Sequence, residues 1–119
     1  MIIYIIVGSF ILFDIVTGII KALYNEGLNS TNLREGLFHK LAEVLAVTGS
    51  GLLEYGMNYI DFGIDIPILK VVVTYICVME LISSLENLAE INPALAKLFR
   101  PYLEKLKNAD SEKDNIEKE

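Results

Sequence analysis

The sequence predicts an all-α integral membrane protein with three transmembrane helices, followed by an amphipathic helix and a charged tail. Hydrophobic residues make up 53% of the 119 residues, and the mean hydropathy is +0.46 despite a charged C-terminal end. Three long segments, 2–24, 37–59 and 67–91, approach or exceed the ~20 residues that a membrane-spanning helix needs. We therefore expect residues 1–92 to form one three-helix transmembrane domain.

Residues 2–24 form the most apolar segment. Each central Ile, Val, Leu or Phe favours membrane insertion by roughly 0.3–0.6 kcal/mol, against a cost of about 3 kcal/mol for one Asp. The segment is therefore expected to insert, and its start lacks the positive charge of a cleavable signal. Its polar residues fall at i, i+3, i+4 and i+7 and share one helical face: Asp14, Thr17, Gly18 and Lys21. An ionisable residue in such a helix indicates a functional site, although Lys21 could instead extend to the interface.

A short polar link follows, in which Gly27 is a candidate helix C-cap and Asn32 with Glu35 resembles a capping pair. The second apolar segment, 37–59, is weaker because its charged residues nearly cancel the insertion energy. Its polar residues again form one stripe: Gly36, Lys40, Glu43, Ser50 and Glu54. Within this stripe Lys40 and Glu43 can pair at i, i+3.

Small residues line the same helix at intervals of four: Ala42, Ala46 and Ser50. Such a row lets a second helix approach closely within a membrane. We therefore expect this helix to insert only with partners. The alternative is the surface helix of a soluble bundle.

The third segment, 67–91, begins with a proline suited to the first helical turn. Its polar side chains share one broad face: Lys70, Cys77, Glu80, Ser84 and Asn87. A free cysteine such as Cys77 usually behaves as a small buried apolar residue. Residues 93–107 have an amphipathic pattern typical of an interfacial helix, which Pro101 should kink or divide. The almost wholly polar residues 108–119 are expected to be a disordered charged tail.

Lysine and arginine predict the orientation, because cytoplasmic loops carry an excess of both. Lys21, Arg34 and Lys40 flank the first link, and six more basic residues follow Pro93, whereas the second link has none. With three spans, both basic regions lie on one side of the membrane. The N-terminus is therefore expected outside and the C-terminus in the cytoplasm.

Several classes of function are disfavoured by composition. The net charge of −6 and a pI of about 4.7 argue against nucleic-acid binding. One histidine, His39, and one cysteine are too few for a His- or Cys-based metal site, and we expect no cofactor. Phosphate-binding glycine loops and G-x-S-x-G elbows do not occur in the sequence. We therefore do not expect an enzyme.

The chain resembles the phage-lysis and toxin-secretion holin family, which includes the holins of clostridial toxin loci. Three motifs in order carry the resemblance. The first is Asp14-x-x-Thr17-Gly18-x-x-Lys21, and the second is Leu33-Arg34-Glu35-Gly36-Leu37 followed by Lys40. The third is Glu80-x-x-Ser83-x-x-Glu86-Asn87, and the amphipathic segment and charged tail are also similar to that family.

The resemblance implies a phage protein that accumulates in the host inner membrane and assembles into lesions. These lesions would release an endolysin or a large protein toxin. The chain is then linked to its cargo by function and need not bind it directly. The implied partners are membrane lipid, further copies of the chain in a homo-oligomer, and an antiholin. No nucleic-acid partner is implied.

The polar stripes allow a compatible mechanism. A polar stripe is costly in lipid, so helices hide it against one another or turn it toward water. We expect the ionisable residues of the three helices to pair between helices when closed, and to form oligomer or lumen contacts when open: Asp14, Lys21, Lys40, Glu43, Glu54, Lys70 and Glu80. The alternatives are a non-lytic scaffold or antiholin-like regulator, and a small ion-channel subunit.

Overall fold

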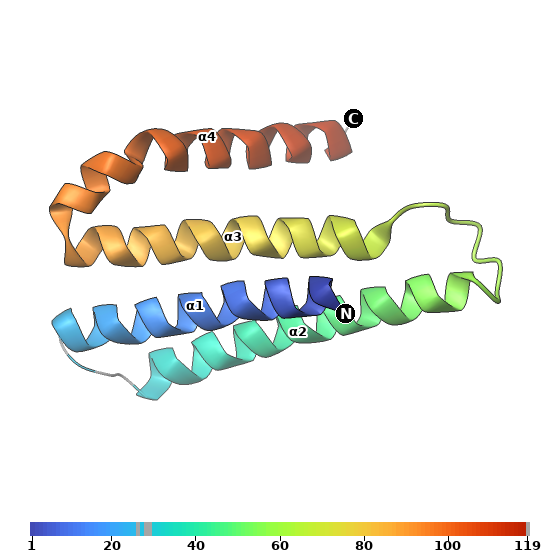
Figure 1. The fold of residues 1–119 in the computed structure, drawn as a ribbon, viewed down its shortest axis with the longest axis horizontal. Helices are drawn as coiled ribbons and strands as arrows, with labels where there is room; N and C mark the ends of the chain where they lie inside the picture. Colours follow the sequence, from blue (N-terminus) through green and yellow to red (C-terminus); the bar gives the residue numbers. More distant parts are fainter. Residues whose placement is uncertain (26, 28–29, 119) are drawn as a thin grey trace.

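A computed structural model describes residues 1–25, 27 and 30–118, with side chains described as far as residue 108. Four helices make up these described ranges: α1 (Ile2–Asn25), α2 (Ser30–Met57), α3 (Ile68–Ile91) and α4 (Pro93–Lys118). Figure 1 shows them as an elongated bundle with all four axes roughly aligned. The predicted all-α class is confirmed.

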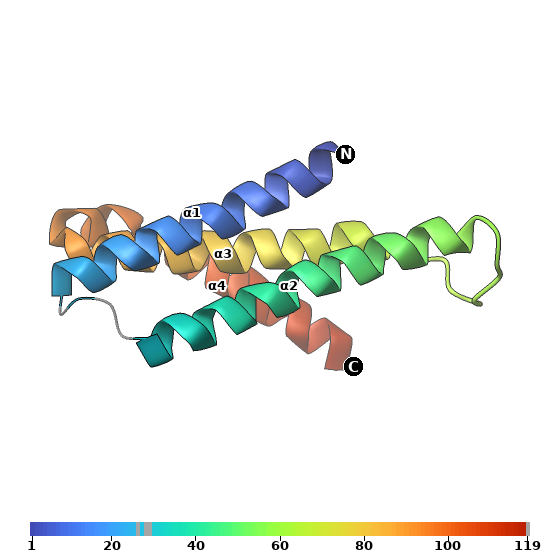
Figure 2. The ribbon, with the colours of Figure 1, turned by 90° about the horizontal axis from the view of Figure 1, so that it is seen from below.

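The central element is α3, which packs against each of the other three helices. Helices α1 and α3 run in the same direction and α2 runs in the opposite one (Figures 1 and 2). Helix α4 turns back along α3 on the side away from α1 and α2. The first three helices therefore alternate in direction, as three successive membrane crossings would.

A small apolar core joins the first three helices. It is formed by Val7 and Ile11 of α1, Val47 of α2, and Val73 and Ile76 of α3. These residues occupy the half of the bundle that contains the start of α1 and the start of α3. Polar residues replace them further along both helices, at Asp14 and Glu80. The apolar contacts thus set the register that brings the polar residues together.

The bundle has an apolar exterior around a partly polar interior. Among the described side chains, six buried residues are apolar and six are polar. Large apolar side chains are meanwhile exposed along the first three helices, including Ile5, Leu12, Phe38, Leu45 and Tyr75. A water-soluble bundle would bury these residues, so the pattern fits a lipid environment.

The helix ends follow their local sequence. Gly27 has a φ of 91° and its N–H donates to the Ala22 carbonyl at 2.6 Å, which satisfies a free acceptor at the end of α1. In the second link Asp61 Oδ1 accepts the Gly63 N–H at 2.8 Å, with Gly63 at a φ of 72°. Asn92 alone separates α3 from α4.

Two helix boundaries differ from the predictions. Helix α2 begins at Ser30 rather than 37, because the polar segment Asn32 to Gly36 adds helical turns before the apolar residues begin. The predicted disordered tail is replaced by helix as far as Lys118; residue 119 and the side chains from 109 lie outside the described part. The sequence after Pro101 contains no glycine or further proline, and its Lys, Glu and Ala residues favour helix. Pro101 does not divide α4, which bends in its early turns (Figure 1).

Composition supports two of the three predicted membrane spans. Within the described ranges, α1 and α3 are long and apolar enough to cross a membrane, whereas α2 is long enough but too polar. The shortfall of α2 comes from its charged residues, including Lys40, Glu43 and Glu54. The role of α2 therefore depends on where those charges lie.

Replacement of Ser84 by leucine is expected to separate α1 from α3. Ser84 has no exposed surface, so a larger side chain must displace a neighbouring helix at a typical cost of about 1–3 kcal/mol. The matched control is Thr74→Leu, an exposed position on the same helix. A lower thermal midpoint in detergent for Ser84→Leu alone would agree with this packing, whereas equal midpoints for both variants would contradict it.

Candidate functional site

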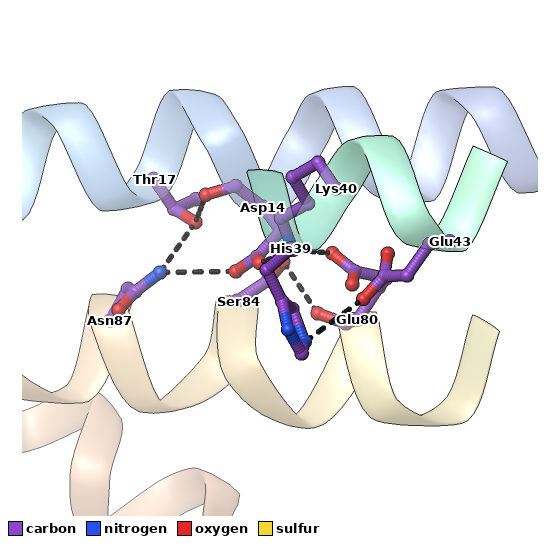
Figure 3. A network of polar contacts seen from close by, with 8 residues as sticks. All are labelled: Asp14, Thr17, His39, Lys40, Glu43, Glu80, Ser84 and Asn87. Carbon is purple, nitrogen blue, oxygen red and sulfur yellow. Dashed lines mark hydrogen bonds and ion pairs between the residues drawn. The ribbon is translucent and has the colours of Figure 1, made fainter. Parts of the chain in front are cut away.

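The candidate site is a polar cluster in which Lys40 of α2 joins α1 to α3. Lys40 Nζ donates to Asp14 Oδ2 and to Glu80 Oε2, each at 2.5 Å. The side chains of Asp14 and Glu80 are 7% and 3% exposed, and that of Lys40 is 16% exposed. Figure 3 shows the ammonium between the two carboxylates. One side chain therefore makes charged contacts with both of the other helices.

Asn87 of α3 hydrogen bonds to the carboxylate oxygen of Asp14 that Lys40 does not contact. Its Nδ2 donates to Asp14 Oδ1 at 3.2 Å and to Thr17 Oγ1 at 3.1 Å. The Thr17 hydroxyl donates in turn to the Asp14 backbone carbonyl at 3.0 Å. Both carboxylate oxygens of Asp14 thus have a donor, which a buried carboxylate needs in a low-dielectric interior.

Ser84 lets the helices come close at this level. It is fully buried, and its hydroxyl donates to the Glu80 backbone carbonyl at 2.8 Å. This bond within α3 satisfies the hydroxyl without a partner on another helix. A small side chain here leaves room for the side chains of Asp14 and Lys40 between the helices.

Glu43 adds a third carboxylate to the cluster. Its Oε1 lies 3.4 Å from His39 Nε2 on the same helix, and its Oε2 is buried with no hydrogen-bond partner among the described residues. Figure 3 shows Glu43 on the Glu80 side of the cluster. The cluster therefore contains three carboxylates and one lysine, of which Lys40 contacts Asp14 and Glu80, and the imidazole of His39, whose side chain is 76% exposed, lies at the rim.

A cavity of about 260 Å³ adjoins the cluster between α1 and α2. Its lining includes Asp14, Lys40 and Asn87, together with the glycines Gly18 and Gly36. These helices make few direct contacts with each other, so the cavity marks where they diverge. The cluster is consequently not sealed on this side by packed side chains.

The chemistry of the cluster is electrostatic. In the part of the chain that the structure describes, no group of three or more His, Cys, Asp or Glu side chains is arranged to hold a metal ion. Buried ion pairs are costly to desolvate, and breaking one by removing a partner typically costs about 3–5 kcal/mol. The arrangement is therefore suited to holding helices in one register and releasing them when a contact is lost.

A model of the bacteriophage holin family matches residues 1–108, which include the whole polar cluster. The chain belongs to this family. No curated protein and no solved structure matches the chain. The family assignment predicted from the three motifs is thus confirmed, and all three motifs lie inside the matched region.

Among the described side chains, the buried polar residues of this family member all come from the predicted stripes. They are Asp14, Thr17, Ser50, Glu80, Ser84 and Asn87. Lys40 and Glu43 lie beside them. Gly18 is half-buried, and a Cβ atom at this position would meet the side chain of Asn87. Helical spacing therefore selected the side chains that face the interior.

Two further stripe residues contact α3 away from the cluster. Glu54 Oε1 accepts the Leu69 N–H at 3.2 Å, so its negative charge lies at the N-terminal end of α3, where the helix dipole favours it. Lys21 Nζ lies 3.4 Å from Glu90 Oε2, with side chains 34% and 56% exposed. These contacts tie α3 to α2 near one end of the bundle and to α1 near the other.

Several residues lie elsewhere than the sequence predicted. Lys70 is exposed near the start of α3, because only two helical residues precede it there. Lys40 bonds to α1 and α3, and Glu43 pairs with His39, in place of the predicted pair between Lys40 and Glu43. Ala42 and Ala46 are exposed, although Ser50 of the same row is buried and donates to the Ala46 carbonyl. The motif residues Arg34 and Gly36, which the sequence placed in the first link, lie within α2 and are exposed.

Two residues of the site were missed from the sequence. The sequence argument about His39 concerns metal binding alone, whereas its position four residues before Glu43 is the signal for a contact along the helix. Glu90, the partner of Lys21, continues the polar face of α3 three residues after Asn87. Both could have been found by extending the same helical spacing.

Proposed function

We propose that this chain is a holin that oligomerises in the bacterial inner membrane and forms lesions that release a phage endolysin or a large protein toxin. The observation that supports it most is the charged cluster buried between helices whose outer surfaces are apolar. Such a chain is stable in lipid only while its polar side chains face one another or water. The function requires no catalytic residue.

We assign three membrane spans, with α2 as the second. Helix α2 runs antiparallel to α1 and α3 beside them, and its charged residues Lys40, Glu43 and Glu54 are turned inward. Its exposed face carries large apolar residues, including Phe38, Leu41, Leu45 and Leu52. Burial of the charges removes most of the cost that makes α2 too polar to span alone.

The basic residues give the orientation of these spans. The N-terminus lies outside and the C-terminus in the cytoplasm, because the α1–α2 link and α4 both carry Lys and Arg. In the same frame the acidic α2–α3 link, with Asp61 and Asp65, faces outward. The Lys21 to Glu90 contact then lies near the cytoplasmic end of α1 and α3.

Opening exchanges one set of partners for another. In the closed state the cluster neutralises Lys40 within one chain. On assembly the same side chains contact neighbouring copies or line a water-filled opening, where hydration replaces the lost ion pairs. The excess of carboxylates over ammonium groups favours that hydrated arrangement, because unpaired charge is most costly in a dry interior.

The test is inducible expression of this chain alone in a bacterium, with simultaneous records of membrane potential, growth and escape of a cytoplasmic wall hydrolase. We expect sudden depolarisation after a delay, together with release of the hydrolase. A helix-breaking variant, Val47→Pro, controls for expression load because proline disrupts α2.

The rival functions give different records in the same experiment. An ion-channel subunit would depolarise the membrane and retain the hydrolase. A regulator of the antiholin kind, expressed without a partner, would leave the membrane polarised and the hydrolase retained. Either record would refute the proposal.

A further inference from the structure

The α3–α4 hairpin contains a second feature that the cluster does not explain. Asn92 alone joins the helices: its N–H donates to the Leu88 carbonyl at 3.0 Å, and its Oδ1 accepts the Ala94 N–H at 3.1 Å. One residue therefore closes α3 and caps α4. With so short a link, α4 lies directly along α3, on the side opposite α1 and α2 (Figure 1).

The contact between α3 and α4 is apolar and loosely packed. Half-buried side chains of α4 include Leu95, Phe99, Leu103 and Leu106. A groove of about 670 Å³ remains between the helices, lined by Leu81 and Leu85 of α3 and by apolar residues of α4. Among the side chains described as far as residue 108, one ion pair crosses the interface, Lys107 Nζ to Glu86 Oε1 at 2.7 Å. Side chains that border an open groove lack partner atoms on that side, so this contact can separate at small cost.

The outer face of the docked α4 carries several charged side chains, beside the exposed Leu98 and Tyr102. Lys97, Arg100, Glu104 and Lys105 are all exposed. On the insertion scale each Lys or Arg at the bilayer centre costs about 2.5–3.5 kcal/mol, so the three basic residues Lys97, Arg100 and Lys105 exceed what a few leucines return. A docked α4 therefore cannot be surrounded by lipid chains beside a membrane-spanning α3, and its outer face requires water.

We propose that α4 lies on the membrane surface while the Leu81 and Leu85 side of α3 faces lipid, and docks along α3 when that side faces the water of an assembled lesion. Docking covers the apolar surface of α3 with a charged one. The C-terminal helix thus lines the opening. This inference rests on the proposed function, because it requires both a spanning α3 and a water-filled lesion.

Cross-linking of the α3–α4 ion pair tests the proposal. The variant carries Glu86→Cys and Lys107→Cys with Cys77→Ser, so that only the designed pair reacts with a short membrane-permeant bismaleimide. The matched control pair is Lys21→Cys with Glu90→Cys, which joins α1 to α3 and should react before depolarisation. We expect the 86–107 product to rise about ten-fold at depolarisation, which corresponds to a ten-fold shift in the equilibrium between undocked and docked α4.

The outcomes separate the two hypotheses. Equal 86–107 product before and after depolarisation, or no product after it, would overturn α4 docking and leave lesion formation standing. Failure of the Cys77→Ser parent to depolarise cells would instead count against the proposed function. Docking is then decided with purified protein in lipid nanodiscs. Little 86–107 product beside a strong product from the control pair supports an undocked α4 in lipid. Equal amounts of the two products overturn the α4 proposal.

Discussion

Replacement of Lys40 by methionine should destabilise the closed three-helix arrangement more than any other single change in the cluster. The substitution keeps the length of the side chain and removes the ammonium that contacts both Asp14 and Glu80. The two buried carboxylates then face each other without a cation, at a typical cost of about 3–5 kcal/mol for one unpaired buried charge. We expect a correspondingly lower free energy of unfolding in detergent, and earlier depolarisation in cells.

The matched control is Lys70→Met, which removes the same charge from an exposed position on α3. Surface substitutions of this kind usually change stability by less than about 0.5 kcal/mol. If the two variants unfolded at the same denaturant concentration, Lys40 could not be the residue that holds the helices together.

Neutralising the three charges that bond to one another should have the opposite effect on stability and a large effect on lysis. In the variant Asp14→Asn, Lys40→Met and Glu80→Gln, these three charges are gone, Glu43 keeps its contact with His39, and the two amides can hydrogen bond to each other and to Asn87. Replacement of a buried ionic group by neutral residues of similar volume is often neutral or stabilising by about 1–4 kcal/mol. The closed bundle should therefore persist, and depolarisation should come later or not occur.

The informative comparison is the timing of depolarisation in Lys40→Met against that in the triple variant, because both lack Lys40. A control with Lys21→Met and Glu90→Gln removes a partly exposed pair, for which the median contribution is about 0–1 kcal/mol, and should leave the timing near that of the parent. Unchanged timing in the triple variant, at normal expression, would show that the charges have no part in opening.

The sequence predicted much of this interior because helical spacing determines which side chains share a face. Asp14 with Thr17, and Glu80 with Ser84 and Asn87, are each separated by three or four residues, and all are buried. Spacing does not determine which helix lies opposite. The partner of Lys40 therefore could not be predicted, and the lysine reaches across to two other helices rather than to Glu43.

Other differences have the same origin. Ala42 and Ala46 were expected to contact a helix, but α1 and α2 diverge and leave both alanines exposed. Lys70 lies on the polar face of α3 by spacing, yet it is too near the start of that helix to reach the cluster. Helix α4 extends further than predicted, because charged composition alone does not imply disorder: Lys and Glu are also good helix formers.

The divergence of α1 and α2 bears on how copies of this chain can associate. Every cluster bond that Lys40 makes goes to a helix other than its own, and α2 is joined to α1 and α3 by links at opposite ends of the bundle. An α2 donated by a neighbouring copy would meet the same Asp14 and Glu80. Domain swapping of this helix would conserve each of those bonds. Copies could then interlock through the same contacts that the single chain already makes.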